Sequence, residues 1–404
     1  MTPTAQSLDA LEDKLAAGRR LTRQDGLAIF ASADLAALGR IADAARRRRH
    51  GLRTWYVVNT HVNYTNVCVN RCDLCAFYRD EGDAEAYLLS PDEVVARAAP
   101  DLEAGATEVH VVGGLHPEVG LDYYLAVIGG LHEAFPRVSI QALTAVEVAR
   151  AAETSGLAVR EVLARLKEAG LTGLPGGGAE IFDSGVRRRI CPNKISGEEW
   201  LAVHRQAHAL GLPTNATMLY GHLEEPEHRV DHLLALRAAQ DETGGFQAFI
   251  PLAFHPQGTR LGSQVGGTAT AEGRDRARAP DTSTPTPTGV SVPPPGGPTA
   301  YDDLKTMAAA RLLLDNVPHV KAFWIMLGED TAQVALRFGA DDIDGTVVRE
   351  EITHAAGART PQGLTPDRIE HLVRAAGCEP VERDTLYRRI KRGQHFSQWE
   401  RSDS

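Results

Sequence analysis

The 404-residue sequence lacks the features of several protein classes. It has no run of about 20 apolar residues, the length that a membrane-spanning helix needs. The first residues, with Asp9, Glu12 and Asp13, lack the basic and then apolar layout of a secretion signal. The net charge of -10 excludes the basic surface on which non-specific nucleic-acid binding rests. We therefore expect a cytoplasmic protein with no membrane or nucleic-acid partner.

Cysteine is also scarce, and its distribution excludes a disulfide framework. The chain has five cysteines, an odd number, which suits a reducing compartment. Three of them, Cys68, Cys72 and Cys75, follow one another with the spacing C-x3-C-x2-C. Cys191 and Cys378 stand alone, and we expect Cys191 to be a packed thiol.

The cysteine triplet predicts a metal site that is short of one protein ligand. Structural zinc sites take four ligands, usually with a second Cys or His pair in register. Iron–sulfur clusters are held by cysteine thiolates, and three cysteines would leave one iron of a 4Fe-4S cluster open to a small molecule. A zinc site with His61 as a distant fourth ligand remains the alternative. Asn70, Arg71 and Asp73 between the cysteines do not suit an inert apolar run.

Strand-like and helix-like segments alternate along most of the chain, which predicts a parallel sheet with right-handed crossovers. Eight such strands favour closure into an α/β (β/α)8 barrel of the TIM type, with its active site at the carboxyl ends of the strands. The predicted strands are 55–61, 108–112, 138–143, 173–181, 214–220, 246–254, 320–326 and 342–347. The predicted helices are 91–104, 122–134, 159–169, 197–210, 227–241, 301–316, 331–338 and 365–376.

Composition divides the chain further. Residues 1–50 predict an N-terminal helical extension of two or three helices, with Thr22 and Ser32 as caps. The barrel would begin at 51–261 and be completed, with a C-terminal helix, at 300–393. Residues 262–299 are rich in glycine and proline and contain no aromatic residue, so we expect a disordered insertion there. Residues 394–404 form a polar tail.

Two glycine-rich stretches follow predicted strands. In Val111-Val-Gly-Gly-Leu-His116, glycines allow backbone amides to approach a ligand closely, so Gly113 and Gly114 could bind the amino-acid end of a ligand. A tight turn is the alternative. In Leu174-Pro-Gly-Gly-Gly-Ala-Glu180, the carboxylate needs hydrogen-bond donors if buried, and ribose hydroxyls would serve. The alternative is a salt bridge to the arginines at 187–189.

Other polar residues at strand ends are weaker candidates. A histidine at such a place is more often structural than catalytic, so we assign no catalytic residue beyond the cysteines. The arginines at 187–189 with Lys194 could attract an acidic substrate, or form a solvated loop. The substrate-binding candidates are His61, Asn215, His222 and His255.

Five stretches together resemble one branch of the radical S-adenosylmethionine (SAM) superfamily, that of the menaquinone futalosine pathway and the related deazaflavin cofactor synthases. They are HVNYTNVCVNRCDLCAF, EVHVVGGLHP, LPGGGAEIFDSGVRRRICPNK, TNATMLYGH and DETGGFQAFIPLAFHP. Within this branch they look most like the aminofutalosine synthases. The resemblance covers residues 59–261 and 302–384, and the insertion at 262–299 departs from it.

The resemblance implies both the cofactors and a reaction. Cys68, Cys72 and Cys75 would hold the 4Fe-4S cluster, while Gly113, Gly114, Glu180 and Ile250 would bind SAM. The 5'-deoxyadenosyl radical would add to 3-[(1-carboxyvinyl)oxy]benzoate, with rearrangement and decarboxylation to aminofutalosine. SAM would be consumed as a co-substrate, and a donor such as flavodoxin or ferredoxin would supply the electron.

Three alternatives to this function remain at the level of sequence. Dehypoxanthine futalosine cyclase and the deazaflavin cofactor synthases belong to the same branch. A non-enzymatic zinc or iron–sulfur protein belongs to another class, although glycine segments and a barrel pattern have no purpose in a simple metal site.

Overall fold

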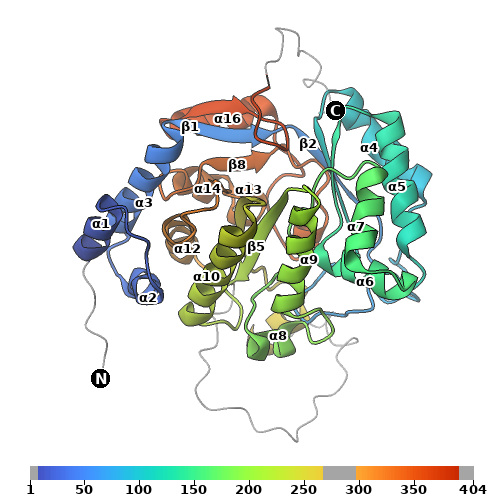
Figure 1. Cartoon of the computed structure of the whole chain (residues 1–404), viewed down its shortest axis with the longest axis horizontal. Coiled ribbons are helices and arrows are strands. Elements are labelled where there is room, and N and C mark those ends of the chain that lie inside the picture. The colour runs from blue at the N-terminus through green and yellow to red at the C-terminus, as the bar shows by residue number, and fades with distance from the viewer. Residues whose placement is uncertain (1–7, 267–296, 391–404) are drawn as a thin grey trace, which may run out of the picture.

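The computed structural model describes residues 8–266 and 297–390 as an α/β structure with helices around a parallel barrel (Figure 1). The strands are β1 (Arg53–Val57), β2 (Asn59–Asn63), β3 (Glu108–Val112), β4 (Ser139–Ala142), β5 (Thr214–Tyr220), β6 (Phe246–Ala253), β7 (His319–Val320), β8 (Asp342–Gly345) and β9 (Glu379–Glu382). The helices are α1 (Leu8–Ala16), α2 (Arg23–Ala31), α3 (Leu35–His50), α4 (Pro91–Glu103), α5 (Leu121–Ala134), α6 (Ala145–Ser155), α7 (Val159–Glu168), α8 (Ser184–Ile190), α9 (Gly197–Ala209), α10 (Pro226–Thr243), α11 (Arg260–Gly266), α12 (Ala300–Leu313), α13 (Trp324–Leu327), α14 (Glu329–Ala335), α15 (Ile352–Ala355) and α16 (Pro366–Ala375).

Short bridges close three parallel sheets into one ring. The sheets are β8-β1-β9, β2-β3-β4 and β5-β6-β7. Gly173 pairs with β4 and Leu174 with β5, Lys321 after β7 pairs with β8, and Thr60 of β2 pairs with Val348 beyond β8. The predicted barrel fold is therefore confirmed, with residues 173–174 as its fourth position and with β1 and β9 outside the ring.

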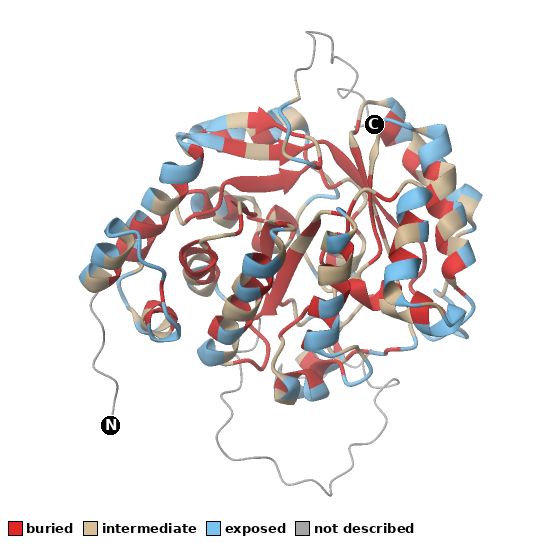
Figure 2. Cartoon of the chain, in the orientation of Figure 1, coloured by how far each residue is buried: buried red, intermediate tan, exposed pale blue. Residues whose placement is uncertain are grey.

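Local sequence explains where the outer helices begin. Ser90, Thr144, Ser196 and Thr299 each accept a hydrogen bond from the backbone three residues later, in capping boxes that begin α4, α6, α9 and α12. In Figure 2 the strands are mostly buried and the outward sides of the helices are exposed. The barrel thus holds the apolar faces of its helices against one continuous core.

The N-terminal extension contains the three helices α1, α2 and α3 over residues 8–50. Thr22 caps α2 as predicted, with its side chain accepting from Asp25 N. Ser32, the second predicted cap, is the C-cap of α2, and Asp34 caps the start of α3. Residues 267–296 of the predicted insertion and the predicted tail at 394–404 lie outside the described residues.

Three predicted strands differ from the observed ones. Residues 55–61 form parts of two strands, β1 and β2, which belong to different sheets. Residues 173–181 make only two bridges, because Pro175 has no N–H and Gly176 and Gly178 have positive φ. Residues 320–326 contribute little to β7, because 324–327 form α13, and a short apolar run does not distinguish strand from helix.

The segment after β9 covers the amino ends of the barrel strands. Thr385 Oγ1 donates to Glu108 Oε2 at 2.5 Å, and its backbone oxygen accepts from Gln247 Nε2. Arg383 Nε and the Tyr387 hydroxyl both donate to Asp342 Oδ2, at 2.7 and 2.8 Å. These contacts make residues 383–387 the floor of the barrel.

A second polar group, around Asp341, lies at the same end. Its carboxylate is fully buried and accepts from Arg311, from Val320 N at 2.9 Å and from His319 Nδ1 at 2.6 Å. Burial opposes ionisation, but Arg311, His319 and His50 together outweigh it and hold the pKa of Asp341 well below its usual value. The Asp341 carboxylate therefore joins α12 to β7 and β8.

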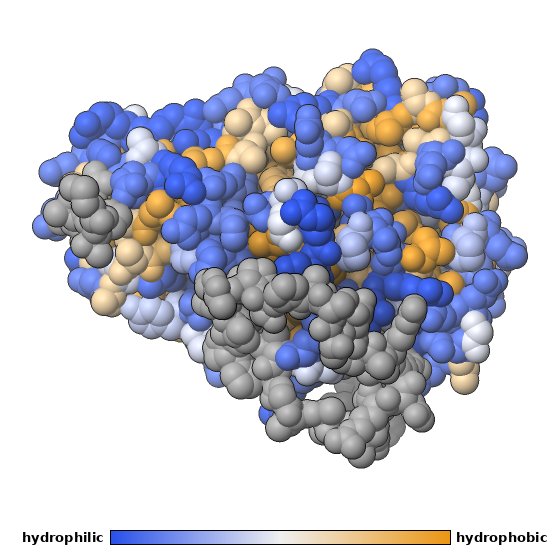
Figure 3. Space-filling model, turned by 90° about the horizontal axis from the view of Figure 1, so that it is seen from below, coloured by the Kyte–Doolittle hydropathy of each residue, from blue (hydrophilic) through white to orange (hydrophobic). Residues whose placement is uncertain are grey.

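The described residues contain no helix that is long and apolar enough to cross a membrane. The face in Figure 3 is largely hydrophilic, with hydrophobic residues in smaller areas between hydrophilic ones.

Replacement of Asp341 tests the buried contact. Asp341→Asn should lower the free energy of unfolding by about 3–5 kcal/mol, because it leaves the Arg311 charge buried without its partner. The measurement is urea denaturation followed by circular dichroism. The control is Asp315→Asn, because the Asp315 carboxylate is 38% exposed where it pairs with Arg20, and the change should stay below about 1 kcal/mol. Equal losses in the two variants would contradict the assignment.

Candidate active site

The three cysteines of the triplet lie on a loop that leaves the carboxyl end of β2. Backbone hydrogen bonds hold this loop on several sides. Cys68 N donates to Arg79 O at 3.2 Å, and Asp73 N donates to Ile190 O at 3.0 Å. Arg260 pairs with the Asp73 carboxylate at 2.7 Å. The loop is therefore fixed by the segment after it, by the end of α8 and by the start of α11.

The glycine pair after β3 packs directly against the cysteine loop. A Cβ on Gly114 would lie 2.2 Å from Val67 O, and one on Gly113 would lie 2.8 Å from the Tyr64 ring. Gly114 N donates to Thr65 O at 2.9 Å. Side chains at these two positions would collide with the loop, so glycine here sets the distance between the two segments.

A buried carboxylate fixes the glycine pair from the other side. Glu147, in the first turn of α6, accepts from Tyr64 Oη at 2.8 Å and from Gly113 N at 3.3 Å. It also accepts from Thr144 N at 2.6 Å. Burial outweighs these donors and raises the pKa of Glu147. The sequence analysis missed this residue, although the capping box Thr144-x-x-Glu147 was visible in it.

The thiols fit a multi-iron cluster better than a single ion. All three thiols come from one loop and line one cavity, and in the described residues the triplet is not a group of ligand atoms as compact as His50, His319 and Asp341, which lie within 4.8 Å of one another. Burial raises the pKa of Cys72 to about 12 and also raises that of Cys75. Bound metal would supply the positive charge that thiolates need in such surroundings.

Glu180 lies beside the cysteine loop and pairs with Lys194. Burial opposes its ionisation, but the charge and hydrogen bond of Lys194 hold the pKa of Glu180 below its usual value. Glu180 has a φ of 47°, in the left-handed region. The arginines at 187–189 do not pair with it: Arg187 donates to the backbone oxygens of Ala179, Ile181 and Ile195, and the other two are exposed.

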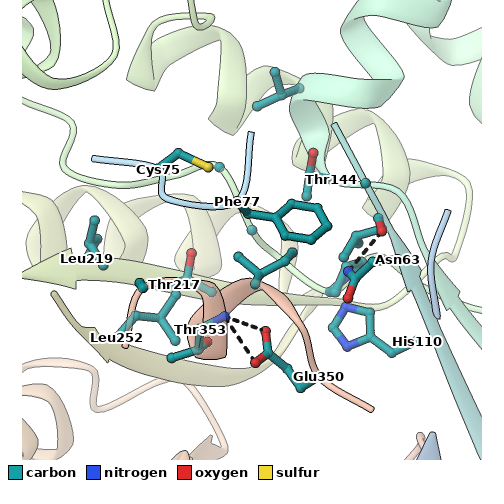
Figure 4. Close-up of a pocket in the computed structure, with 18 of the residues that line it drawn as sticks. Asn63, Cys75, Phe77, His110, Thr144, Thr217, Leu219, Leu252, Glu350 and Thr353 are labelled. Atoms are coloured by element: carbon teal, nitrogen blue, oxygen red, sulfur yellow. Dashed lines mark hydrogen bonds between the residues drawn. The ribbon is translucent and has the colours of Figure 1, made fainter. Parts of the chain in front are cut away.

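The sequence-predicted residues gather around one cavity at the carboxyl ends of the strands, except for His222 and the arginines at 187–189. In Figure 4, Cys75, Phe77, Thr144 and Thr217 surround it. His222 is not among its lining residues, and both of its ring nitrogens are engaged in the turn after β5, with Leu219 O and Leu223 N. The predicted residues that line the cavity are Cys68, Cys72, Cys75, Gly113, Gly114, Glu180, Lys194, His61, Asn215, Ile250 and His255.

Several polar lining residues were missed from the sequence. Glu350 accepts from Thr353 N at 3.0 and 3.1 Å and faces the cavity beside His110 (Figure 4). The sequences of β2 and β3 did contain a signal for these residues. Polar residues alternate along both strands, although a barrel buries its strands on both faces. The missed polar residues that line the cavity include Asn59, Glu108, His110, Gln141, Lys321, Asp344 and Glu350.

Comparison with known proteins agrees with this geometry. The model of the Radical SAM superfamily matches residues 62–236, and that of the CofH/MqnC C-terminal region matches residues 297–396. The methylornithine synthase crystal structure superposes with a TM-score of 0.66 at 18% identity, covering 92% of this chain and 97% of that one. The FeFe-hydrogenase maturase HydG from Carboxydothermus hydrogenoformans gives 0.67 at 16% identity, covering 96% and 81%. Both structures share the fold.

Sequence relatives extend over nearly the whole chain. The aminodeoxyfutalosine synthase of Thermus thermophilus is 44% identical over 381 residues, which cover 94% of this chain and 95% of that protein. The Streptomyces coelicolor enzyme of the same name is 44% identical over 93% of this chain and 92% of its own. The 5-amino-6-(D-ribitylamino)uracil–L-tyrosine 4-hydroxyphenyl transferase of Methanocaldococcus jannaschii is 36% identical over 92% and 97%. The chain therefore belongs to the radical SAM superfamily and is a radical SAM enzyme homologous to the aminodeoxyfutalosine synthases.

Proposed function

We propose that the chain is an aminodeoxyfutalosine synthase of menaquinone biosynthesis. It would join the 5'-deoxyadenosyl group of SAM to the enol-ether double bond of 3-[(1-carboxyvinyl)oxy]benzoate. Rearrangement and decarboxylation would then give 6-amino-6-deoxyfutalosine and leave methionine. The observation that carries this proposal is the 44% identity to two synthases over more than nine-tenths of the chain.

Three cysteines and a glycine pair supply the cofactor part of the proposal. Cys68, Cys72 and Cys75 would hold a 4Fe-4S cluster, which when bound supplies the electron that cleaves SAM. Gly113 and Gly114 would bind the methionine end of SAM, because bare backbone lies next to the cysteine loop. Glu180 would accept from ribose hydroxyls, and Ile250 would pack against the nucleoside. A one-electron donor such as flavodoxin or ferredoxin would act from outside.

The barrel itself contributes to the reaction by positioning the reactants. The alkene and the adenosyl carbon must meet at near-contact distance, and correct placement of reactants lowers the barrier substantially. Apolar lining residues such as Phe77, Leu252 and Phe323 exclude water from the space between the cysteine loop and the strands. His61, Asn215 and His255 line the same cavity and are proposed as substrate contacts.

A second candidate reaction comes from the transferases. Those of Methanosarcina acetivorans and Methanopyrus kandleri are 39% and 38% identical, over 88% and 87% of this chain. Their name states L-tyrosine and 5-amino-6-(D-ribitylamino)uracil as substrates. The two substrate pairs differ in charge, since the benzoate is a dianion and tyrosine has no net charge at neutral pH.

The products separate these reactions. Anaerobic incubation of the reconstituted enzyme with SAM, 3-[(1-carboxyvinyl)oxy]benzoate and dithionite as the electron donor should give a product whose mass contains the adenosyl group. A parallel incubation with L-tyrosine and 5-amino-6-(D-ribitylamino)uracil should give no coupled product. Free 5'-deoxyadenosine as the main nucleoside in the first incubation, or coupling in the second, would overturn the proposal.

Loss of one cysteine should abolish the adduct. In Cys68→Ala, Cys72→Ala or Cys75→Ala we expect iron and sulfide to fall well below four atoms of each per chain, and product to fall to background. Cys378→Ala is the matched control, because that thiol is buried beside Arg46, outside the cavity lining. A triplet variant with parental iron content and turnover would refute the cluster assignment.

An added methyl group at Gly114 should weaken SAM binding. The Cβ of Gly114→Ala would meet Val67 O at 2.2 Å, and overpacking of this kind costs about 1–3 kcal/mol. We expect about a tenfold or larger rise in the dissociation constant of SAM in equilibrium dialysis with the reconstituted enzyme. In Gly129→Ala the methyl would meet nothing within 4 Å, so binding should stay at the parental level. Parental affinity in both variants would show that the close contact is irrelevant to SAM.

A further inference from the structure

The part of the cavity nearest the amino ends of the strands is lined by polar side chains. In most TIM barrels, branched apolar residues fill this interior in layers. Here β2, β3 and β4 place His61, His110 and Gln141 in register, directly beside one another. Polar groups in a barrel interior are costly unless they are hydrogen-bonded. The arrangement therefore indicates a binding function at this depth.

Two lysines line the cavity, and they differ in how closely their ammonium groups pair with a carboxylate. Lys194 lies beside the cysteines and forms a tight pair with Glu180. Lys321, which is 5% exposed, lies deep in the barrel after β7, and its contact with Asp344 Oδ1 measures 3.4 Å. Charge-assisted hydrogen bonds measure about 2.7–2.9 Å, and an ammonium group has three donors. Among the described residues, Asp344 is the one hydrogen-bond partner of this ammonium, so Lys321 keeps donors for a ligand.

The polar side chains near Lys321 also have hydrogen-bonding atoms that are available to a ligand. The rings of His61 and His110 lie 4.4 Å apart between centroids. Burial lowers the pKa of His110 to about 4 and that of His61 well below its usual value, so both rings are neutral at pH 7, and each has one N–H donor. The described residues give the ring nitrogens of His110 no hydrogen-bond partner, and the buried Gln141 Oε1 has none either.

We propose that Lys321, with His61 and His110, forms a carboxylate subsite that takes the ring carboxylate of an aromatic acid. This inference rests on the proposed function and deepens it by naming the group that orients the substrate. The cysteines lie at the opposite, open end of the cavity. A benzoate held at Lys321 therefore directs its meta enol-ether substituent toward the cysteine loop and the glycine pair. A 4-hydroxyphenyl group lacks the carboxylate and would lose this contact.

Asp344 sets the competing electrostatics. Its carboxylate lies 3.4 Å from the Lys321 ammonium, and it also repels an incoming anion. Loss of Lys321 alone would leave Asp344 buried without a partner, which is destabilising. The double variant Lys321→Met/Asp344→Asn removes both charges together. It therefore separates loss of the subsite from loss of the fold, with thermal unfolding as the check on folding.

Binding of unreactive probes tests the subsite apart from the reaction. The probes are 3-ethoxybenzoate and 3-ethoxybenzamide, which have no alkene, bound anaerobically to the reconstituted enzyme without SAM in isothermal titration calorimetry. The parent should bind the acid about 10- to 100-fold more tightly than the amide, as expected for one hydrogen bond to a charged group. In the double variant this preference should disappear through weaker binding of the acid. Lys167→Met, a surface change on α7 outside the cavity lining, should keep it.

The results for the parent and the double variant test the carboxylate subsite and the proposed function separately. A double variant that retains the parental preference for the acid overturns the subsite, even where the parent makes the adenosyl adduct. A parent that prefers the acid but makes no adduct retains the subsite and overturns the proposed function. A parent without any preference for the acid overturns the subsite directly.

Discussion

The whole site depends on one close approach between two backbone segments. The cysteine loop and the glycine pair touch where Val67 O faces Gly114, at a distance that leaves no space for a side chain. Hydrogen bonds between Thr65, Gly114, Val69 and Leu115 extend this contact along both segments. Because β2 and β3 pair in parallel, their carboxyl ends deliver the loop and the glycines to the same place. The parallel register of β2 and β3 thus determines where the three thiols lie.

The cavity below this contact has two chemically different ends. At the open end Glu180 and Lys194 form a tight ion pair beside the cysteines. At the deep end Lys321 and the neutral histidines form a looser one. SAM carries a positively charged sulfonium, whereas an aromatic acid carries a negatively charged carboxylate. The two molecules therefore need different surroundings. In the proposed function, SAM would bind at the open end and the aromatic acid at the deep end.

The sequence predicted the barrel well, and it also carries local signals for several residues that line the open end of the cavity. The C-x3-C-x2-C spacing, the glycine pair and the strands at 108–112 and 214–220 all carry local signals, and these two strands agree with β3 and β5. The deep end could not be predicted in this way. Lys321 lies after a two-residue strand inside an apolar run, and its position in the cavity depends on a bridge to Asp342. Likewise, the contact between Glu108 and Thr385 joins residues 277 positions apart, for which a single sequence gives no signal.

The floor formed by residues 383–387 ties the two matched regions of the chain into one structure. Arg383 and Tyr387 come from the C-terminal region, while Glu108, which Thr385 contacts, belongs to the radical SAM region. The cavity is therefore closed at the amino ends of the strands by a segment of the C-terminal region. A chimaera that combines either region with that of another protein would have to preserve the contact between Thr385 and Glu108.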